Sequence, residues 1–464
     1  MGQPILSPGK GHWDEVGNKG TERQAQSNPA EASASAATWQ AAKPTVGARL
    51  KAAASWVAER ELWVVAVPVT LMLFYGRLPI QIIGASLLLI PVPWLCRWAA
   101  RGYLTDRTPM DLPILILLGM ALVGLYPSVD HSMSVPVLYK MIVEFALFYG
   151  LANSFHSERR IRTVIVVVLL AGTGVSLLGL VGTGGMTYDI SAFLGGHKDL
   201  VIQLVRRLNE AGFNGNIVGG TVAMIFPTYL FLFLFDSSGL WKLFLGLSLP
   251  LVGATLLLTQ SRGAIVGVIL ALLVVGIWWN RWVLVSVPVL AAGILWAVRH
   301  FGAQQVAEFL LVTNTTATVA GRSELWQRAI YMMQDFPYTG IGLGTFAKVA
   351  PILYPFFLIG PDANVPHAHN LILQAGVDLG VPGLVAFIGF LTTFSLIALQ
   401  TLCPARNTPL KPLSAGLLCG FMVYLIHGLV DHVTFSTKPG IAIWAIMGLM
   451  VAVHCHYDKR DLVR

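Results

Sequence analysis

Long apolar stretches follow one another along the chain from about residue 60, separated by short polar turns. A helix of about twenty apolar residues is long enough to cross the hydrocarbon core of a bilayer. The pattern therefore predicts an all-α polytopic membrane protein with about twelve transmembrane helices. Several segments are short or contain proline and glycine, which membrane helices tolerate where neighbours satisfy the freed backbone groups. The predicted segments are 61–75, 78–96, 111–127, 135–153, 162–183, 217–235, 240–259, 263–280, 282–298, 380–402, 412–430 and 438–456.

The first 48 residues lack this pattern and are rich in alanine, serine, glutamine and glycine. Such a composition cannot bury enough apolar surface to fold, and no apolar core follows a basic start as it would in a signal peptide. We expect residues 1–48 to form a disordered cytoplasmic tail. Residues 49–464 are then expected to form one transmembrane domain, without an internal repeat.

Composition excludes a water-soluble protein. Apolar residues make up 55% of the chain and charged residues 12%, and the mean hydropathy is +0.68. A soluble protein carries about 25% charged residues. The net charge of +8 is explained by basic loops of a membrane protein, so no nucleic-acid partner is predicted.

Basic residues recur in alternate loops, and this sets the predicted orientation. By the positive-inside rule these loops are cytoplasmic, so both termini are predicted to lie in the cytoplasm. The even number of predicted segments agrees with two termini on the same side. Two long loops, 184–216 and 299–379, then face the periplasm. The residues that define the cytoplasmic side are Arg97, Arg101, Arg107, Arg159, Arg160, Arg162, Arg281, Arg406, Lys411, Lys459, Arg460 and Arg464.

The longer outer loop, between the ninth and tenth segments, contains a stretch with helical periodicity at 323–335. An amphipathic helix of this kind is expected to lie along the membrane interface, with Trp326 and Tyr331 near the headgroups. Its predicted apolar face consists of Leu325, Trp326, Ala329, Ile330 and Met333.

Arginines also occur on the predicted outer side, where the charge rule expects few. Arg262 lies in a tight turn at 259–263 and can present its guanidinium to a phosphate, or else anchor a helix end in the interface. Arg322 precedes the interfacial helix, whose N-terminus favours an anion, although pairing with Glu324 or a lipid headgroup is the alternative. Arg206 and Arg207 are candidates for binding either substrate or lipid.

A polar cluster at 366–371 precedes the tenth segment. Histidine has an ordinary pKa of about 6.5 and accepts a proton near neutrality, so His369 is the candidate for proton transfer. His367 either orients a neighbour or faces water. A metal site at His367 and His369 would need a third ligand, and no cysteine or carboxylate stands at ligand spacing nearby. Asp362 is the closest acid. No metal or other cofactor is therefore predicted. The chain also lacks an Asp-x-Asp element for a divalent ion, which leaves arginine to neutralise a pyrophosphate.

These residues carry a family resemblance. His369 and Asn370, nine further residues, and then Gly380–Val381–Pro382–Gly383 resemble the His-[Asn/Ser/Gln]-x9-Gly-x-x-[Gly/Thr/Tyr] pattern of bacterial O-antigen ligases. The arginine motifs at 261–263 and 321–326 resemble motifs of the wider ligase and polymerase superfamily. His367 is a departure from the pattern, and the spacing selects His369.

The resemblance implies a GT-C-like glycosyltransferase in the bacterial inner membrane. It would transfer O-antigen from undecaprenyl pyrophosphate to a sugar hydroxyl of lipid A–core on the periplasmic face, with inversion and without a metal. His369 would be the base, and Arg262 and Arg322 would bind the pyrophosphate. Asp431 would orient His369 or a sugar, unless it is only a solvated helix-end residue.

Other functions remain open from sequence. An O-antigen polymerase and a protein O-oligosaccharyltransferase of the same superfamily share this chemistry. A transporter of an anionic lipid or sugar would instead need charged groups near the bilayer midplane. Lys140 and Glu144 in the fourth segment are the nearest such groups, at the spacing of a helical ion pair.

Overall fold

The computed structural model describes residues 45–73, 75, 78–153, 157–182, 215–236, 238–303, 319–360, 365–402, 408–431, 435 and 438–462. The predicted tail lies outside these ranges except for residues 45–48, and 46–48 belong to the first helix. The chain divides into two units, Met1–Leu50 and Lys51–Arg464, and the second unit holds every element from α3 onward.

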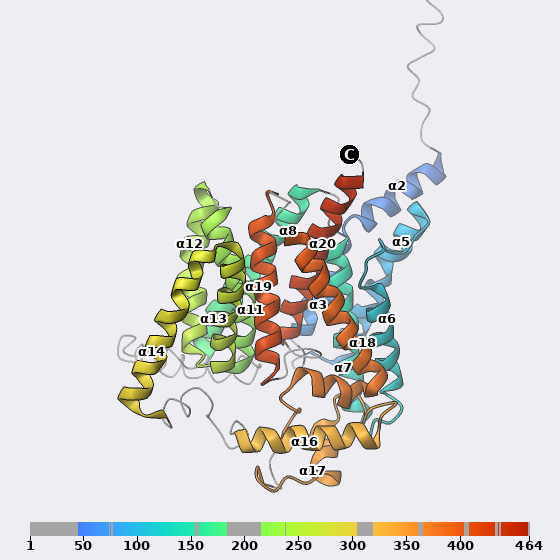
Figure 1. Cartoon of the computed structure of the whole chain (residues 1–464). Coiled ribbons are helices and arrows are strands. Elements are labelled where there is room, and N and C mark those ends of the chain that lie inside the picture. The colour runs from blue at the N-terminus through green and yellow to red at the C-terminus, as the bar shows by residue number, and fades with distance from the viewer. Residues whose placement is uncertain are drawn as a thin grey trace, which may run out of the picture. The chain divides into compact units, whose positions relative to one another are not determined.

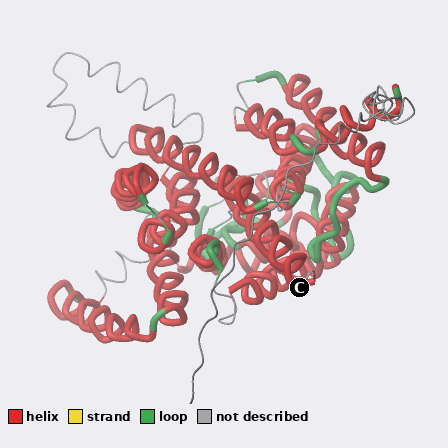
Figure 2. Tube along the Cα trace, turned by 90° about the horizontal axis from the view of Figure 1, so that it is seen from above, coloured by secondary structure: helices red, strands yellow, loops and turns green. Residues whose placement is uncertain are grey.

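Helices are the only regular elements in the described ranges, apart from an isolated bridge between Tyr75 and Leu78 (Figure 2). They are α2 (Val46–Ala58), α3 (Glu61–Leu73), α4 (Ile80–Ser86), η1 (Leu87–Leu89), α5 (Pro91–Arg101), α6 (Asp111–Val123), α7 (His131–Ala152), α8 (Glu158–Gly182), α11 (Gly215–Phe235), α12 (Gly239–Leu258), α13 (Arg262–Trp279), η2 (Arg281–Val285), α14 (Ser286–Phe301), α16 (Val319–Asp335), α17 (Phe346–Leu353), α18 (Leu371–Leu402), α19 (Lys411–Gly428) and α20 (Lys438–Leu462).

The chain is an all-α polytopic membrane protein. Nine helical spans among the described residues are long and apolar enough to cross a membrane, judged by length and composition. The other three predicted segments also contain helices, namely α3 and α6, which are shorter, and α19. The total of twelve crossings stays a prediction. The nine spans are Ile80–Arg101, His131–Ala152, Glu158–Val181, Gly215–Phe235, Gly239–Leu258, Arg262–Trp279, Arg281–Phe301, Leu371–Leu402 and Lys438–Asp458.

Helix α19 lies inside the bundle, against α11, α13 and α20 (Figure 1). Its small residues allow this, because glycine lets two helix backbones approach closely. A Cβ at Gly416 would meet Thr228 Cα of α11 at 2.6 Å. Since most of α19 is buried by protein rather than by lipid, it needs less hydrophobicity than a helix on the lipid-facing side.

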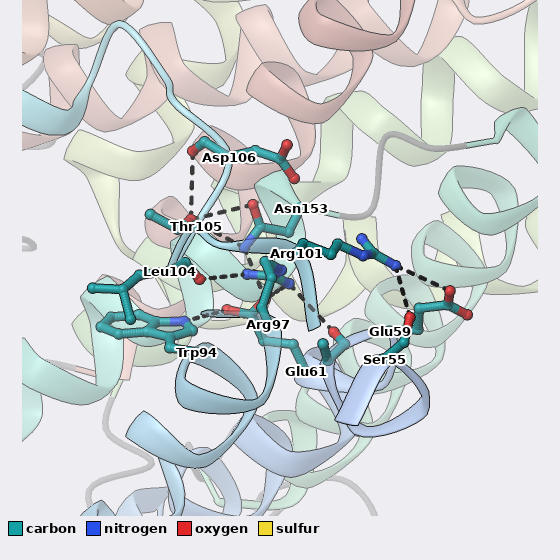
Figure 3. Close-up of polar contacts among 11 residues, drawn as sticks. Ser55, Glu59, Glu61, Trp94, Arg97, Arg101, Leu104, Thr105, Asp106 and Asn153 are labelled. Carbon is teal, nitrogen blue, oxygen red and sulfur yellow. Dashed lines mark hydrogen bonds and ion pairs between the residues drawn. The ribbon is translucent and has the colours of Figure 1, made fainter. Parts of the chain in front are cut away.

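Buried polar groups join three helices at one end of the bundle (Figure 3). The carboxylate of Glu61 in α3 accepts hydrogen bonds from Arg97 (2.5 Å) and Trp94 (2.6 Å) of α5, and from Asn153 (2.8 Å) after α7. A buried ion pair is tolerated when further hydrogen bonds satisfy its remaining atoms. This cluster therefore fixes the packing of α3, α5 and α7.

Three more of the arginines predicted to be cytoplasmic lie at this same end, which we call the basic end. Arg101 and Arg160, from two different loops, both pair with Glu59, at 3.2 and 3.1 Å. Arg162 bonds to Asp236 (2.7 Å), which follows α11. These three arginines therefore share one end of the bundle, and the cytoplasmic orientation of that end stays a prediction.

The opposite end, which we call the histidine end, is built around α16, α17 and a break in α18 (Figure 1). The segment predicted at 380–402 begins as a helix at Leu371, and Gly380 interrupts it with φ of 67°. In an unbroken helix the Val381 N–H would bond to the Val377 carbonyl. Here the Val381 N–H donates to the Pro337 carbonyl (2.7 Å), and the Val377 carbonyl accepts from Ile341 (3.0 Å). The 337–341 segment thus satisfies both groups of the missing bond.

The predicted interfacial helix exists as α16 and begins at Val319, four residues before the predicted start at 323. Leu325, Ala329 and Met332 form its buried face. Ile330, which the periodicity assigned to that face, is 44% exposed. The earlier start places Arg322 within the first turn rather than before the helix.

Replacing Gly380 by alanine should destabilise the histidine end. A Cβ there would meet the Tyr338 carbonyl carbon at 2.8 Å, and the positive φ is itself unfavourable for an L-residue by about 1–2 kcal/mol. We expect a lower thermal unfolding midpoint for Gly380→Ala in detergent. The matched control is Gly389→Ala in the same helix, where a Cβ meets nothing within 4 Å. An unchanged midpoint in both variants would contradict this account of the break.

Candidate active site

His369 lies in a short loop that leads into α18, and its backbone is unusual. Its φ is 47°, in the left-handed region that residues other than glycine seldom adopt. The loop is held by Gln374, whose side-chain oxygen accepts the Ala368 N–H at 2.8 Å. Strained backbone of this kind gathers at functional sites, where the surrounding structure maintains it.

Asn370 joins two helices at this point. Its side-chain oxygen accepts the backbone N–H groups of Ile372 and Leu373, both at 3.0 Å, and so caps the start of α18. Its side-chain nitrogen donates to the Leu429 carbonyl (3.1 Å), just past the end of α19. The second residue of the motif therefore has a positioning role, because it ties the start of α18 to the segment that carries Asp431.

Asp431 forms the closest polar contact of His369. Its Oδ1 is 3.1 Å from His369 Nδ1, and the side chains of His369 and Asp431 are 21% and 13% exposed. Burial raises the pKa of Asp431, but the His369 hydrogen bond and the neighbouring histidines lower it more, so the pKa lies below its ordinary value. An ionised carboxylate accepts the proton on Nδ1. The lone pair of His369 is then on Nε2.

A further histidine, His427 of α19, lies on the other side of Asp431. Its Nε2 is 4.0 Å from Asp431 Oδ2, and the side chain is buried. Neither ring nitrogen has a hydrogen-bond partner within the described residues. Sequence reasoning missed His427, although its spacing of four residues from Asp431 on a helix end was a usable signal.

Arg262 is the first residue of α13, and its motif contacts this cluster through Gly263. A Cβ at Gly263 would meet His427 Nδ1 at 2.8 Å, so only glycine allows this approach. The turn before it packs on α11, where a Cβ at Gly219 would meet the Ser261 Cβ at 2.5 Å. The start of α13 is thus held against α11 and α19, and Arg262 is the neighbour in sequence of the residue that approaches His427.

Arg322 in the first turn of α16 is the second cation of the site. Burial lowers its pKa, and the charge of Asp431 opposes that shift. Its Nε is buried without a hydrogen-bond partner in the described part of the chain. The structure, which describes both residues, shows no ion pair between Arg322 and Glu324, which was the alternative considered from sequence.

Glu324 instead binds the loop after α17. Its carboxylate accepts the backbone N–H groups of Phe357 (2.6 Å), Leu358 (2.9 Å) and Ile359 (3.1 Å). Burial raises the pKa of Glu324, but these bonds lower it more, so the pKa lies below its ordinary value. The carboxylate is therefore a structural anion.

Of the remaining predicted site residues, His367 lies next to His369, whereas the others are not described by the structure. The centroid of the His367 ring lies 4.3 Å from that of the His369 ring. The argument that no third metal ligand is near was wrong, because the fold brings Asp431 to both histidines. Arg206, Arg207 and Asp362 lie outside the described residues. The functional roles assigned to all these residues stay predictions.

Two substitutions at Asn370 should separate its two contacts. Asn370→Ala removes the cap of α18 and the bond to Leu429, whereas Asn370→Asp keeps the cap and loses only that bond. We expect Asn370→Ala to cost about 0.5–2 kcal/mol, the usual value of an N-cap, and Asn370→Asp to cost less. Thermal unfolding in detergent measures both. Equal losses would assign the stabilisation to the Leu429 bond alone.

The comparisons with known proteins bear on this end of the molecule. None of the curated proteins matches the chain. Residues 247–388 match the family model described as O-antigen ligase, a stretch that includes Arg262, Arg322 and His369 and ends before Asp431. This stretch of the chain is therefore similar to the O-antigen ligase family.

Proposed function

We propose that the chain is an O-antigen ligase of the bacterial inner membrane. It transfers O-antigen polysaccharide from undecaprenyl pyrophosphate to a sugar hydroxyl of lipid A–core on the periplasmic face. The observation that carries the proposal is the His369–Asp431 pair beside Arg322, in a chain whose residues 247–388 match the O-antigen ligase family. Both termini are then cytoplasmic, because the basic end faces the opposite side of the membrane.

His369 is the base of the proposed reaction. The acceptor oxygen bonds to C1 of the donor sugar, and its proton passes to His369 Nε2. The bond between C1 and the pyrophosphate oxygen breaks, and the electron pair leaves with pyrophosphate. Attack from the face opposite the leaving group inverts the anomeric carbon. Asp431 holds Nδ1–H and stabilises the imidazolium that forms.

Arg262 and Arg322 are the proposed pyrophosphate ligands. Guanidinium groups bind phosphate oxygens through two parallel hydrogen bonds, and a partly buried guanidinium stabilises developing charge more than an exposed one. Arg322 is partly buried, and Arg262 begins a helix whose N-terminal N–H groups also favour an anion. The reaction then needs no metal, and activity should persist in excess chelator.

The lipopolysaccharide of a deletion strain tests the proposal. We expect lipid A–core without any O-antigen, restored by the wild-type chain and not by His369→Ala at equal membrane abundance. Core with a single repeat unit would indicate a polymerase instead. Normal lipopolysaccharide with a glycoprotein defect would indicate a protein O-oligosaccharyltransferase. Activity retained in His369→Ala would refute its role as base.

Arg262→Lys should lower the transfer rate although it keeps the positive charge. An ammonium group cannot reproduce the two parallel hydrogen bonds of a guanidinium, and loss of one such contact costs about 100- to 1000-fold in rate. The control is Arg299→Lys, an exposed arginine in the last turn of α14. Transfer by purified protein measures both variants. A full rate in Arg262→Lys would return Arg262 to a role in anchoring α13.

A further inference from the structure

Three side chains at the histidine end offer a set of metal ligands. His367, His369 and Asp431 each present one ligand atom, and these atoms all lie within 4.8 Å of one another. Ligand bonds to Zn²⁺ are about 2.0–2.2 Å long, so neighbouring ligands on a tetrahedral ion stand about 3.4 Å apart. His369 Nδ1 and Asp431 Oδ1 are already 3.1 Å apart. Only His367 has to move toward the other two.

In the structure, the ring of His367 bonds to the backbone of its own loop. Its Nδ1 accepts the His369 N–H at 3.4 Å, which is a long and weak hydrogen bond. Its side chain is partly exposed, as is that of His369, so an ion can reach both from solvent. The site is therefore open enough to load without opening the fold.

The ligand types select a class of ion. Two imidazoles, one carboxylate and a position left for water are typical of open zinc sites, and Co²⁺ and Ni²⁺ accept the same ligands. Mg²⁺ and Ca²⁺ prefer sites made of oxygen alone. His427 lies 4.0 Å from the second oxygen of Asp431, whereas the first oxygen contacts His369.

The charge of Arg322 acts against a cation. It interacts electrostatically with Asp431, so a bound ion would share that carboxylate with a guanidinium. This repulsion lowers affinity below that of a permanent zinc centre. The ion is then expected to exchange rather than to remain as a cofactor.

We propose that His367, His369 and Asp431 reversibly bind a divalent ion of the zinc class, and that this ion inhibits transfer by occupying the base. An ion on His369 Nε2 takes the lone pair that would accept the proton. An ion on Nδ1 moves the ring proton to Nε2, with the same result. The inhibition rests on the proposed function, whereas the binding does not. His367, which departs from the ligase pattern, provides the additional ligand.

Binding is measured with Co²⁺ as a spectroscopic probe on the full chain in detergent. We expect one Co²⁺ per chain, with visible d–d absorption bands that Zn²⁺ displaces. His367→Ala should weaken binding at least about tenfold, as loss of one of three ligands should. His300→Ala, which removes an exposed histidine of α14, should leave it unchanged. Absence of a saturable band, or equal binding by His367→Ala, would overturn the site.

Inhibition is measured by titrating Zn²⁺ into the transfer reaction, with each variant compared with its own metal-free rate. We expect Zn²⁺ to stop transfer and chelator to restore it. The half-inhibiting concentration should rise at least tenfold in His367→Ala and not in His300→Ala. No effect of Zn²⁺, or stimulation, would overturn the inhibition. A chain that binds Co²⁺ but transfers nothing would refute both the proposed function and the inhibition. The metal site itself is tested by the Co²⁺ bands alone.

Discussion

The exchange of one hydrogen bond at the break of α18 organises the histidine end. Val381 and Val377 give up the bond they would share in a continuous helix, and each bonds to the 337–341 segment instead. A backbone group left unsatisfied at this depth would be costly, so the break and the segment depend on each other. The short first part of α18 is thereby held at a fixed position, and His369 precedes it. The glycine of the motif therefore helps to position the loop that carries His369.

Three buried or partly buried carboxylates show how the same group is used in different ways. Glu61 bonds to Arg97, and Glu324 accepts three backbone N–H groups and lies 3.7 Å from Arg328. Arginine and backbone N–H groups do not act as acids or bases near neutral pH. Asp431 bonds to a histidine, the side-chain type used most often for proton transfer. Of these three environments, only that of Asp431 links a buried charge to a proton that can move, which is why we place the chemistry there.

Local sequence patterns predicted much of the fold and selected candidate residues for the site. Hydropathy located the helices because each one buries apolar side chains in lipid or protein, and motif spacing selected His369. Contacts between distant segments were not predictable in this way. His369 and Asp431 are 62 residues apart, and a search for metal ligands near His367 found only Asp362. The contact of Glu324 with a loop more than thirty residues away could not be predicted from sequence for the same reason.

The position of Asp431 along the chain also has a consequence for biosynthesis. The ribosome makes α18 before α19, and Asp431 follows α19, so His369 emerges well before its carboxylate partner. The bond from Asn370 to Leu429 likewise waits for the end of α19. Insertion of α19 into the centre of the bundle is thus the step that completes the histidine pair. A nascent chain that stalls before α19 would have His369 without the carboxylate that it contacts in the folded chain.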